Sequence, residues 1–216
     1  MPSLTSANRL DRGRKTIKNT LNDPAIKAAV LPYGYNDTEL AVGDGLLTVA
    51  DSATTAALLK ASAQKSATKA VTAALKRARQ WYSDYLGDAR TIFPTQNAER
   101  AVLGIDQGEV PAATAEFIKV ATAVYKAAHA APTDIKAKLA KRSWNDTKLA
   151  QAEATLTELI AADLAQQSAL SQNQQATQTK DAALDALDAW VKEYRNFAKK
   201  ALRENPQALE ALGIKA

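Results

Sequence analysis

The chain has 216 residues, of which 46% are apolar and 6% aromatic, and it contains eight glycines and no cysteine. The absence of cysteine excludes disulfides, thiolate metal sites and cysteine nucleophiles. The net charge is +5, but residues 1–109 carry 14 basic and 11 acidic residues and residues 110–216 carry 14 and 12. Neither half is therefore a basic tail of the kind that binds nucleic acid. An alanine-rich, glycine-poor chain predicts an all-α fold.

The first predicted helix runs from about Leu4 to Leu21, where apolar residues recur at helical spacing, and Asn22-Asp23-Pro24 ends it. A short helical piece from Ala25 to Leu31 follows. The other face of the first helix is basic, which indicates either a phosphate-binding stripe or a solvated surface. The residues of this face are Arg9, Arg12, Lys15 and Lys18.

The next helix is expected to begin at Asn36, with Glu39 three residues later completing a capping box. The apolar pattern then fades at Ser62-Ala63-Gln64 and, in the second half of the chain, at Ser171-Gln172-Asn173. We interpret each of these stretches as a tight turn between two long antiparallel helices. Asn145 is the predicted cap of the corresponding helix in the second half.

A hairpin folded at the first turn places Trp81 opposite Gly43 and Gly45, and the second hairpin places Trp190 opposite alanines. Small residues facing an indole leave the groove that the ring fills. This packing explains two glycines inside a predicted helix, where each would otherwise cost about 1 kcal/mol. We therefore expect Gly45→Leu to destabilise the fold.

Each half closes with a short helix followed by glycine, Gln96 to Leu103 before Gly104 and Pro206 to Leu212 before Gly213. The segment Asp106 to Pro111 is a short linker, after which a helix is expected from Ala113 to Ala130.

These patterns occur twice, and the spacing between the two copies is constant. Tyr35-Asn36-Asp37-Thr38 returns as Trp144-Asn145-Asp146-Thr147, Trp81 as Trp190 and Tyr85 as Tyr194. Positions related by this spacing are called equivalent below. The sequence predicts a tandem-duplicated antiparallel helical bundle, with one repeat in residues 1–109 and the other in residues 110–216. The repeats could pack as two bundles or as one continuous bundle.

No motif predicts an enzyme, a cofactor or a metal centre. The single histidine, His129, lies near a helix end without a nucleophile motif, which excludes the usual hydrolytic triad and the histidine pairs of di-iron bundles. No glycine-rich phosphate loop is present. We expect the aspartates of the last long helix to be solvated rather than to act as acids or bases.

Those aspartates form one stripe, and the equivalent positions of the first repeat are not acidic. Asp185 corresponds to Lys76 and Asp188 to Arg79, while Asp181 completes the acidic stripe. Complementary stripes could dock repeat on repeat or subunit on subunit, or each could simply face water.

Two segments carry a resemblance to known proteins: residues 176–190, from Ala176 to Trp190, and residues 205–214, from Asn205 to Ile214. Both resemble a family of uncharacterised bacterial all-helical proteins with this duplicated layout. The resemblance implies a bacterial origin and the same fold, and it implies no activity.

The predicted role is that of a non-enzymatic interaction or scaffold protein, with a protein partner or self-association. The alternative is a ligand-binding bundle with a pocket at Trp81 and Tyr85 or at Trp190 and Tyr194. No apolar run reaches the length that spans a bilayer and no signal peptide is evident, so a cytoplasmic protein without membrane insertion is expected. Specific nucleic-acid binding is not expected.

Overall fold

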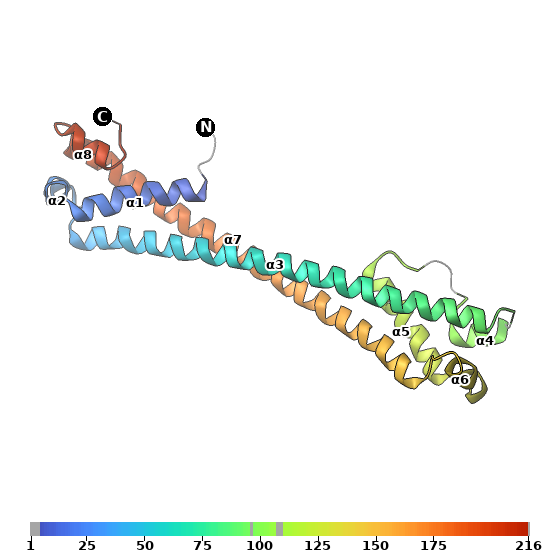
Figure 1. Ribbon diagram of the computed structural model, residues 1–216. Helices are drawn as coiled ribbons and strands as arrows, with labels where there is room; N and C mark the ends of the chain where they lie inside the picture. The colour runs from blue at the N-terminus through green and yellow to red at the C-terminus, as the bar shows by residue number, and fades with distance from the viewer. Residues whose placement is uncertain (1–4, 96, 107–109, 216) are drawn as a thin grey trace. The chain divides into compact units, whose positions relative to one another are not determined.

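The computed structural model describes residues 5–95, 97–106 and 110–215, and within them the fold is all-α, as predicted. Figure 1 shows the helices in chain order, from α1 to α8. Their bounds are α1 Ser6–Asn22, α2 Pro24–Val30, the short 3-10 helix η1 Leu31–Tyr33, α3 Asp37–Ile92, α4 Asn97–Leu103, α5 Thr114–Ala130, α6 Thr133–Ala140, α7 Asp146–Ala201 and α8 Pro206–Ala211. The expected helix start at Gln96 and most of the predicted linker, residues 107–109, lie outside the described residues.

The predicted helix starts are confirmed by their hydrogen bonds. The Oδ1 of Asn36 accepts the backbone N–H of Glu39 at 3.0 Å, and the Oδ1 of Asn145 accepts that of Lys148 at 2.9 Å. The reciprocal half of the capping box is absent among the described contacts, because the carboxylate of Glu39 instead accepts the indole N–H of Trp190. Tertiary packing has therefore redirected a side chain that local sequence assigned to the cap.

The predicted C-terminal caps are also confirmed. Gly104 and Gly213 have φ of +64° and +66°, the left-handed conformation that glycine adopts without strain. The residue after each glycine, Ile105 or Ile214, is buried and donates its N–H back into the preceding helix, to Arg100 and Leu209 respectively. This is the Schellman arrangement, in which an apolar contact accompanies the cap.

The two predicted hairpin turns are wrong. Residues 62–64 lie inside α3 and residues 171–173 lie inside α7, so each long helix is continuous over 56 residues. Both stretches are polar but contain no glycine or proline, and alanine, glutamine and lysine around them are good helix formers. The loss of apolar residues in these stretches therefore indicates a solvated helix. A turn would need helix-breaking residues such as glycine or proline.

The structure consists of two units, and each takes residues from both halves of the chain. Unit 1 comprises residues 1–62 and 171–216, and unit 2 comprises residues 63–170. In unit 1 the first part of α3 is therefore combined with the last part of α7, and in unit 2 the opposite ends of the same helices are combined. The division of the sequence into repeats at residue 109 remains a prediction from the sequence.

Each unit has its own hydrophobic core. In unit 1, Ile17 of α1 packs with Leu47 of α3 and Leu187 of α7, and a second cluster joins α2 to α8 through residues such as Ile26 and Leu209. In unit 2, side chains of α5 and α6 fill the space between the long helices. The largest of its fully buried side chains are Trp144, Tyr85, Tyr125, Phe93 and Phe117.

The glycine packing predicted for one hairpin occurs between the two halves of the chain instead. A Cβ built on Gly43 would lie 2.6 Å from Cη2 and Cζ2 of Trp190, so this glycine opens the groove for an indole. Gly45 is exposed, and a Cβ there would meet nothing within 4 Å. The pairing of Trp81 with these glycines was wrong because α3 does not fold back on itself.

Candidate functional site

The tryptophan and tyrosine of the second half of the chain, Trp190 and Tyr194, lie in an aromatic cluster of unit 1. Their rings are stacked, with centroids 5.3 Å apart and an interplanar angle of 6°. Tyr35, at the entrance to α3, meets both rings edge-on at 5.8 and 4.9 Å. Such edge-to-face pairs add stability beyond burial of their area.

The corresponding residues of the first half of the chain, Trp81 and Tyr85, lie in an aromatic cluster of unit 2. Trp144 takes the place of Tyr35 and meets Trp81 edge-on at 6.2 Å and Tyr85 at 5.0 Å. Tyr85 and Trp144 are buried, and so is Tyr194 in unit 1. The structure therefore brings each predicted pair together as part of a packed cluster.

Each cluster has one indole whose N–H is paired with a carboxylate of α3. Trp190 Nε1 donates to Glu39 Oε1 at 2.9 Å, and Trp144 Nε1 donates to Asp88 Oδ2 at 2.7 Å. A partly buried indole N–H needs such an acceptor, because an unpaired donor would lose its hydrogen bond to water. In unit 1 this hydrogen bond joins α3 to α7. In unit 2 it joins α3 to Trp144, the residue before the N-cap of α7.

The tyrosine hydroxyls distinguish the two clusters. In unit 1, the hydroxyls of Tyr194 and Thr20 are 2.5 Å apart, and Thr20 also donates to the carbonyl oxygen of Thr16. In unit 2, the hydroxyls of Tyr85 and Tyr125 are buried and have no hydrogen-bond partner among the described residues. Burial raises the pKa of both tyrosines, with a smaller contribution from Tyr82 to each and from Glu153 and Asp84 to Tyr125, so both stay neutral.

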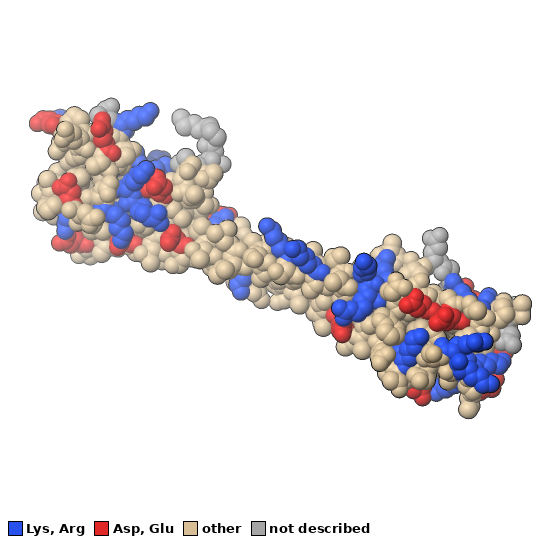
Figure 2. Space-filling model, in the orientation of Figure 1, with Lys and Arg blue, Asp and Glu red and all other residues tan. Residues whose placement is uncertain are grey.

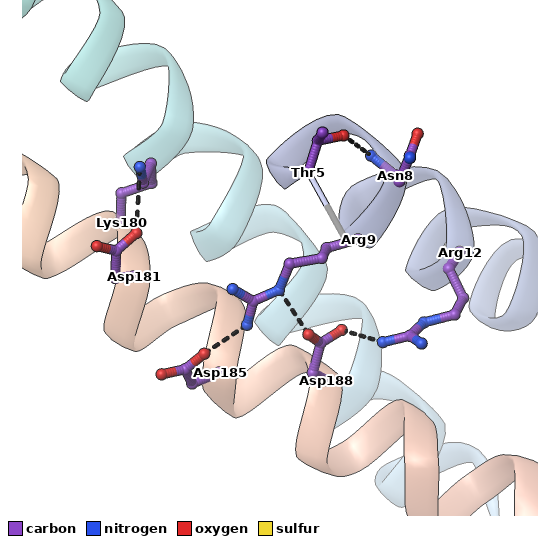
Figure 3. A network of polar contacts seen from close by, with 8 residues as sticks. All are labelled: Thr5, Asn8, Arg9, Arg12, Lys180, Asp181, Asp185 and Asp188. Carbon is purple, nitrogen blue, oxygen red and sulfur yellow. Dashed lines mark hydrogen bonds and ion pairs between the residues drawn. The ribbon is translucent and has the colours of Figure 1, made fainter. Parts of the chain in front are cut away.

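The predicted acidic stripe on α7 contacts α1, as Figure 3 shows. Arg9 donates through Nε to Asp188 Oδ2 and through a terminal nitrogen to Asp185 Oδ1, both at 2.5 Å. Arg12 donates to the other oxygen of Asp188 at 2.6 Å. Asp181 lies one turn earlier, 3.1 Å from the Nζ of its neighbour Lys180.

This ion-pair network is partly shielded from water. The side chains of Arg9 and Asp188 are only 18% and 25% exposed, whereas that of Asp185 is 75% exposed. Burial alone would lower the pKa of Arg9, but the hydrogen bonds and charges of Asp185 and Asp188 outweigh it and raise that pKa. The network therefore anchors α1 to α7.

The basic residues matched to these aspartates have different partners. Arg79 donates to the carbonyl oxygens of Pro111 and Ala112 at 2.9 and 2.6 Å, and its guanidinium lies 5.4 Å from the ring centroid of Phe117. Lys76 has no ion pair among the described residues and lines a shallow recess with Arg79. Asp185, Asp188 and Arg79 thus contact other segments of their own units, whereas Asp181 pairs within its own helix.

Among the described residues, few side chains have the chemistry of a hydrolytic or metal site. His129 lies in the last turn of α5, with Nε2 3.4 Å from Glu153 and Nδ1 3.8 Å from Asp146. In the described part of the chain no group of three or more histidine, aspartate or glutamate residues has the geometry to hold a metal ion. Nor does any described helix combine the length and the apolar character needed to cross a membrane.

Comparisons of the chain with protein-family models, curated proteins and solved structures found no match.

Sequence reasoning missed the two residues that complete these sites, Arg9 in the ion-pair network and Tyr35 in the aromatic cluster. Arg9 belonged to a basic stripe whose spacing was visible, but its partner lies 179 residues away. Tyr35 and Trp144 share a position of the repeated motif, and this match of two large aromatics was the signal for their common role.

Proposed function

We propose that this protein is a non-enzymatic helical interaction or scaffold protein that self-associates through its long helices. The observation that supports this most directly is the exposure of two adjacent leucines on α3, Leu58 and Leu59, which are 68% and 67% exposed. Neighbouring exposed leucines on a helix mark a surface that another protein can cover.

The long helices bury little where these leucines lie. In the described segments 51–62 and 171–182 of unit 1, Ala57 is the only buried residue. Helix pairs with small and polar side chains between them gain little from the hydrophobic effect, which scales with buried apolar area. Covering Leu58 and Leu59 with a further helix would add the apolar area that this part of the pair lacks.

A second copy of the chain is the partner that we favour. Leu58 and Leu59 are uncharged and adjacent, so the same surface on two subunits can meet around a twofold axis without electrostatic repulsion. The equivalent positions of α7 are Gln167 and Ser168. At these positions α3 thus carries two leucines where α7 carries two polar residues, and the exposed leucines of α7, Leu164 and Leu170, flank that polar pair.

We also infer that the two halves of the chain arose by tandem duplication of an antiparallel helical module. The helix bounds support this inference, since α3 and α7 have equal lengths and begin at equivalent positions, Asp37 and Asp146. The starts of α4 and α8, at Asn97 and Pro206, are equivalent in the same way. Membership of the resembling bacterial family and a cytoplasmic location are part of the same proposal.

The alternative function, a ligand pocket at the repeated tryptophans and tyrosines, has less support. The rings of Trp190 and Tyr194 stack on each other, and Tyr85 packs edge-on against both Tyr125 and Trp144. Space beside these rings is thus taken by other side chains of the same core.

Self-association can be tested by native mass spectrometry together with light scattering of the purified chain over a range of concentrations. We expect a reversible dimer that shifts toward monomer in the variant L58Q/L59S. These substitutions install the residues that α7 carries at the equivalent positions, so the helix should form normally, which far-UV circular dichroism checks.

The reciprocal variant, Q167L/S168L, is a matched control because it adds the same apolar pair to α7. We expect it to strengthen association or to produce larger assemblies. A wild-type chain that is monomeric at every concentration, or a mass unaffected by L58Q/L59S, would contradict the proposal.

A further inference from the structure

A recess in unit 2 lies between the last turns of α3 and the C-terminal end of α6. Its volume is about 790 Å³, within the range of small-molecule sites. Asp88 and Thr91 line it from α3, and Lys138, Lys141, Arg142 and Ser143 line it from the other side. Figure 2 shows basic side chains gathered at this end of unit 2, over α6.

The charges around this recess are unbalanced. Lys138, Lys141 and Arg142 face a single lining carboxylate, Asp88, which is already engaged by the indole N–H of Trp144. Lys138 is 3.8 Å from Glu99, outside the lining, whereas Lys141 and Arg142 have no ion pair within the described residues. Two cations that line one recess without a counterion repel each other, and an anionic ligand would relieve that repulsion.

Ser143 adds a second and independent observation. It is the only described residue other than glycine with positive φ, at +70°. Ser143 lies just beyond α6, and its backbone N–H donates to the carbonyl oxygen of Ala140. The N–H of the next residue, Trp144, donates to the carbonyl oxygen of Leu139. Glycine suits this position, and the equivalent residue of the first half is indeed Gly34, with φ +90°. Ser143 is itself one of the residues that line the recess, and backbone strain of this kind concentrates at functional positions.

Unit 1 has a recess at the equivalent place. Its volume is about 700 Å³, and its wall includes Tyr33 and Lys200, which are equivalent to Arg142 and Thr91 of the first recess. The lining cations are Lys199, Lys200 and Arg203, against one carboxylate, Glu204.

The two recesses keep the same charge with different residues. Each has three lining cations and one lining carboxylate, a formal balance of +2. Lys138 and Lys141 correspond to Ala29 and Pro32 in the first half, so the charge is not a simple copy. Because different residues produce the same excess of positive charge, we infer that both recesses need this charge for the same purpose.

We propose that these two recesses bind phosphate-type oxyanions, one in each unit. An excess of two positive charges matches a phosphate dianion, and the lining combines guanidinium, ammonium and hydroxyl donors, the groups that bind phosphate oxygens. This binding does not depend on the self-association proposed above, because Leu58 and Leu59 line neither recess.

Isothermal titration of the full-length chain with pyrophosphate tests the proposal, using matched sodium chloride injections to account for ionic strength. We expect saturable binding of two pyrophosphates per chain. The variant K141Q/R142Q should retain one site, K199Q/K200Q should also retain one, and the combined variant none. Loss of two charge-assisted contacts should weaken the affected site by about tenfold or more.

The matched control is K65Q/K69Q, which removes the same charge from exposed positions of α3 in unit 2. It should keep both sites. Ser143→Gly should weaken the unit 2 site severalfold while raising the melting temperature, a combination that a purely structural serine would not give. Absence of saturable binding, an unchanged stoichiometry in K141Q/R142Q, or an equal loss in K65Q/K69Q would each overturn the proposal.

Discussion

The indole of Trp190 lies against Gly43, and its N–H reaches Glu39 one turn earlier on the same helix, at 2.9 Å. The glycine provides the groove and the glutamate provides the acceptor, so α3 recognises both the shape and the polarity of the ring. This contact joins α3 to α7, which are far apart in the sequence, beside the core of unit 1.

Gly43→Ala should lower the free energy of unfolding by about 1–3 kcal/mol, because the new methyl group would overlap a ring that Tyr35 and Tyr194 hold in place. Alanine is otherwise the better helix former by about 1 kcal/mol. Gly45→Ala is the matched control, since its methyl group meets nothing, and it should raise stability. Urea denaturation of both variants measures the difference. Equal effects of the two substitutions would show that the indole does not restrict Gly43.

The expectation for Gly45→Leu from the sequence loses its basis, because a Cβ at Gly45 meets nothing within 4 Å.

Tyr194→Phe and Tyr125→Phe should change stability in opposite directions. The hydroxyl of Tyr194 is paired with Thr20, and its removal should cost about 1–2 kcal/mol by leaving a buried partner with one contact fewer. The hydroxyl of Tyr125 is buried without a described partner, so its removal should leave stability unchanged or raise it. Thermal unfolding of the two variants is the measurement, and a larger loss for Tyr125→Phe would contradict the contacts described here.

Asp188→Asn should destabilise unit 1 by about 1–3 kcal/mol, since the aspartate accepts from both Arg9 and Arg12 in a partly buried network. The loss should shrink as salt is added, because screening weakens the wild-type ion pairs. Lys76→Gln is the comparison, and its effect should stay within about 0.5 kcal/mol. Denaturation at low and high ionic strength measures both. A salt-independent loss for Asp188→Asn would indicate a packing defect instead of lost charge pairing.

Stability should fall at alkaline pH. Burial, with the nearby charges of Glu193 and Glu39, raises the pKa of Tyr35 from 10.0 to about 12. The folded state holds this proton more tightly than the unfolded state, so the contribution is fully present below pH 10 and is lost between pH 10 and about 12. Melting temperatures across this range should decline less steeply in Tyr35→Phe than in the wild type. Parallel declines would exclude Tyr35 as a contributor.

Local features of the fold could be predicted from the sequence. The caps at Asn36 and Asn145 and the glycine caps at Gly104 and Gly213 depend on residues within one turn of each other. Their hydrogen bonds form whenever those residue types occur at that spacing, whatever surrounds them. The all-α class follows in the same way, because the propensities of alanine, glutamine and lysine act along the whole chain.

The candidate sites could be predicted only in part. The stripe of Asp185 and Asp188 was visible as helical spacing, and so was its charge contrast with Lys76 and Arg79. The partners of these aspartates could not be predicted. Charge complementarity alone does not distinguish Arg9 from Lys76 as the residue that an aspartate contacts. Burial of the guanidinium of Arg9 between two carboxylates decides this, and burial is a tertiary quantity.

The sequence by itself determined that this protein is helical, where most of its helices begin and end, and which positions recur in its two halves. The tertiary structure decided that α3 and α7 continue through the polar stretches at residues 62–64 and 171–173, and that Trp190 therefore packs on Gly43 rather than on its own half of the chain. The physical reason is that helix propensity and capping act over one or two turns. The choice of a packing partner instead depends on which apolar surfaces, far apart in the sequence, can be buried together.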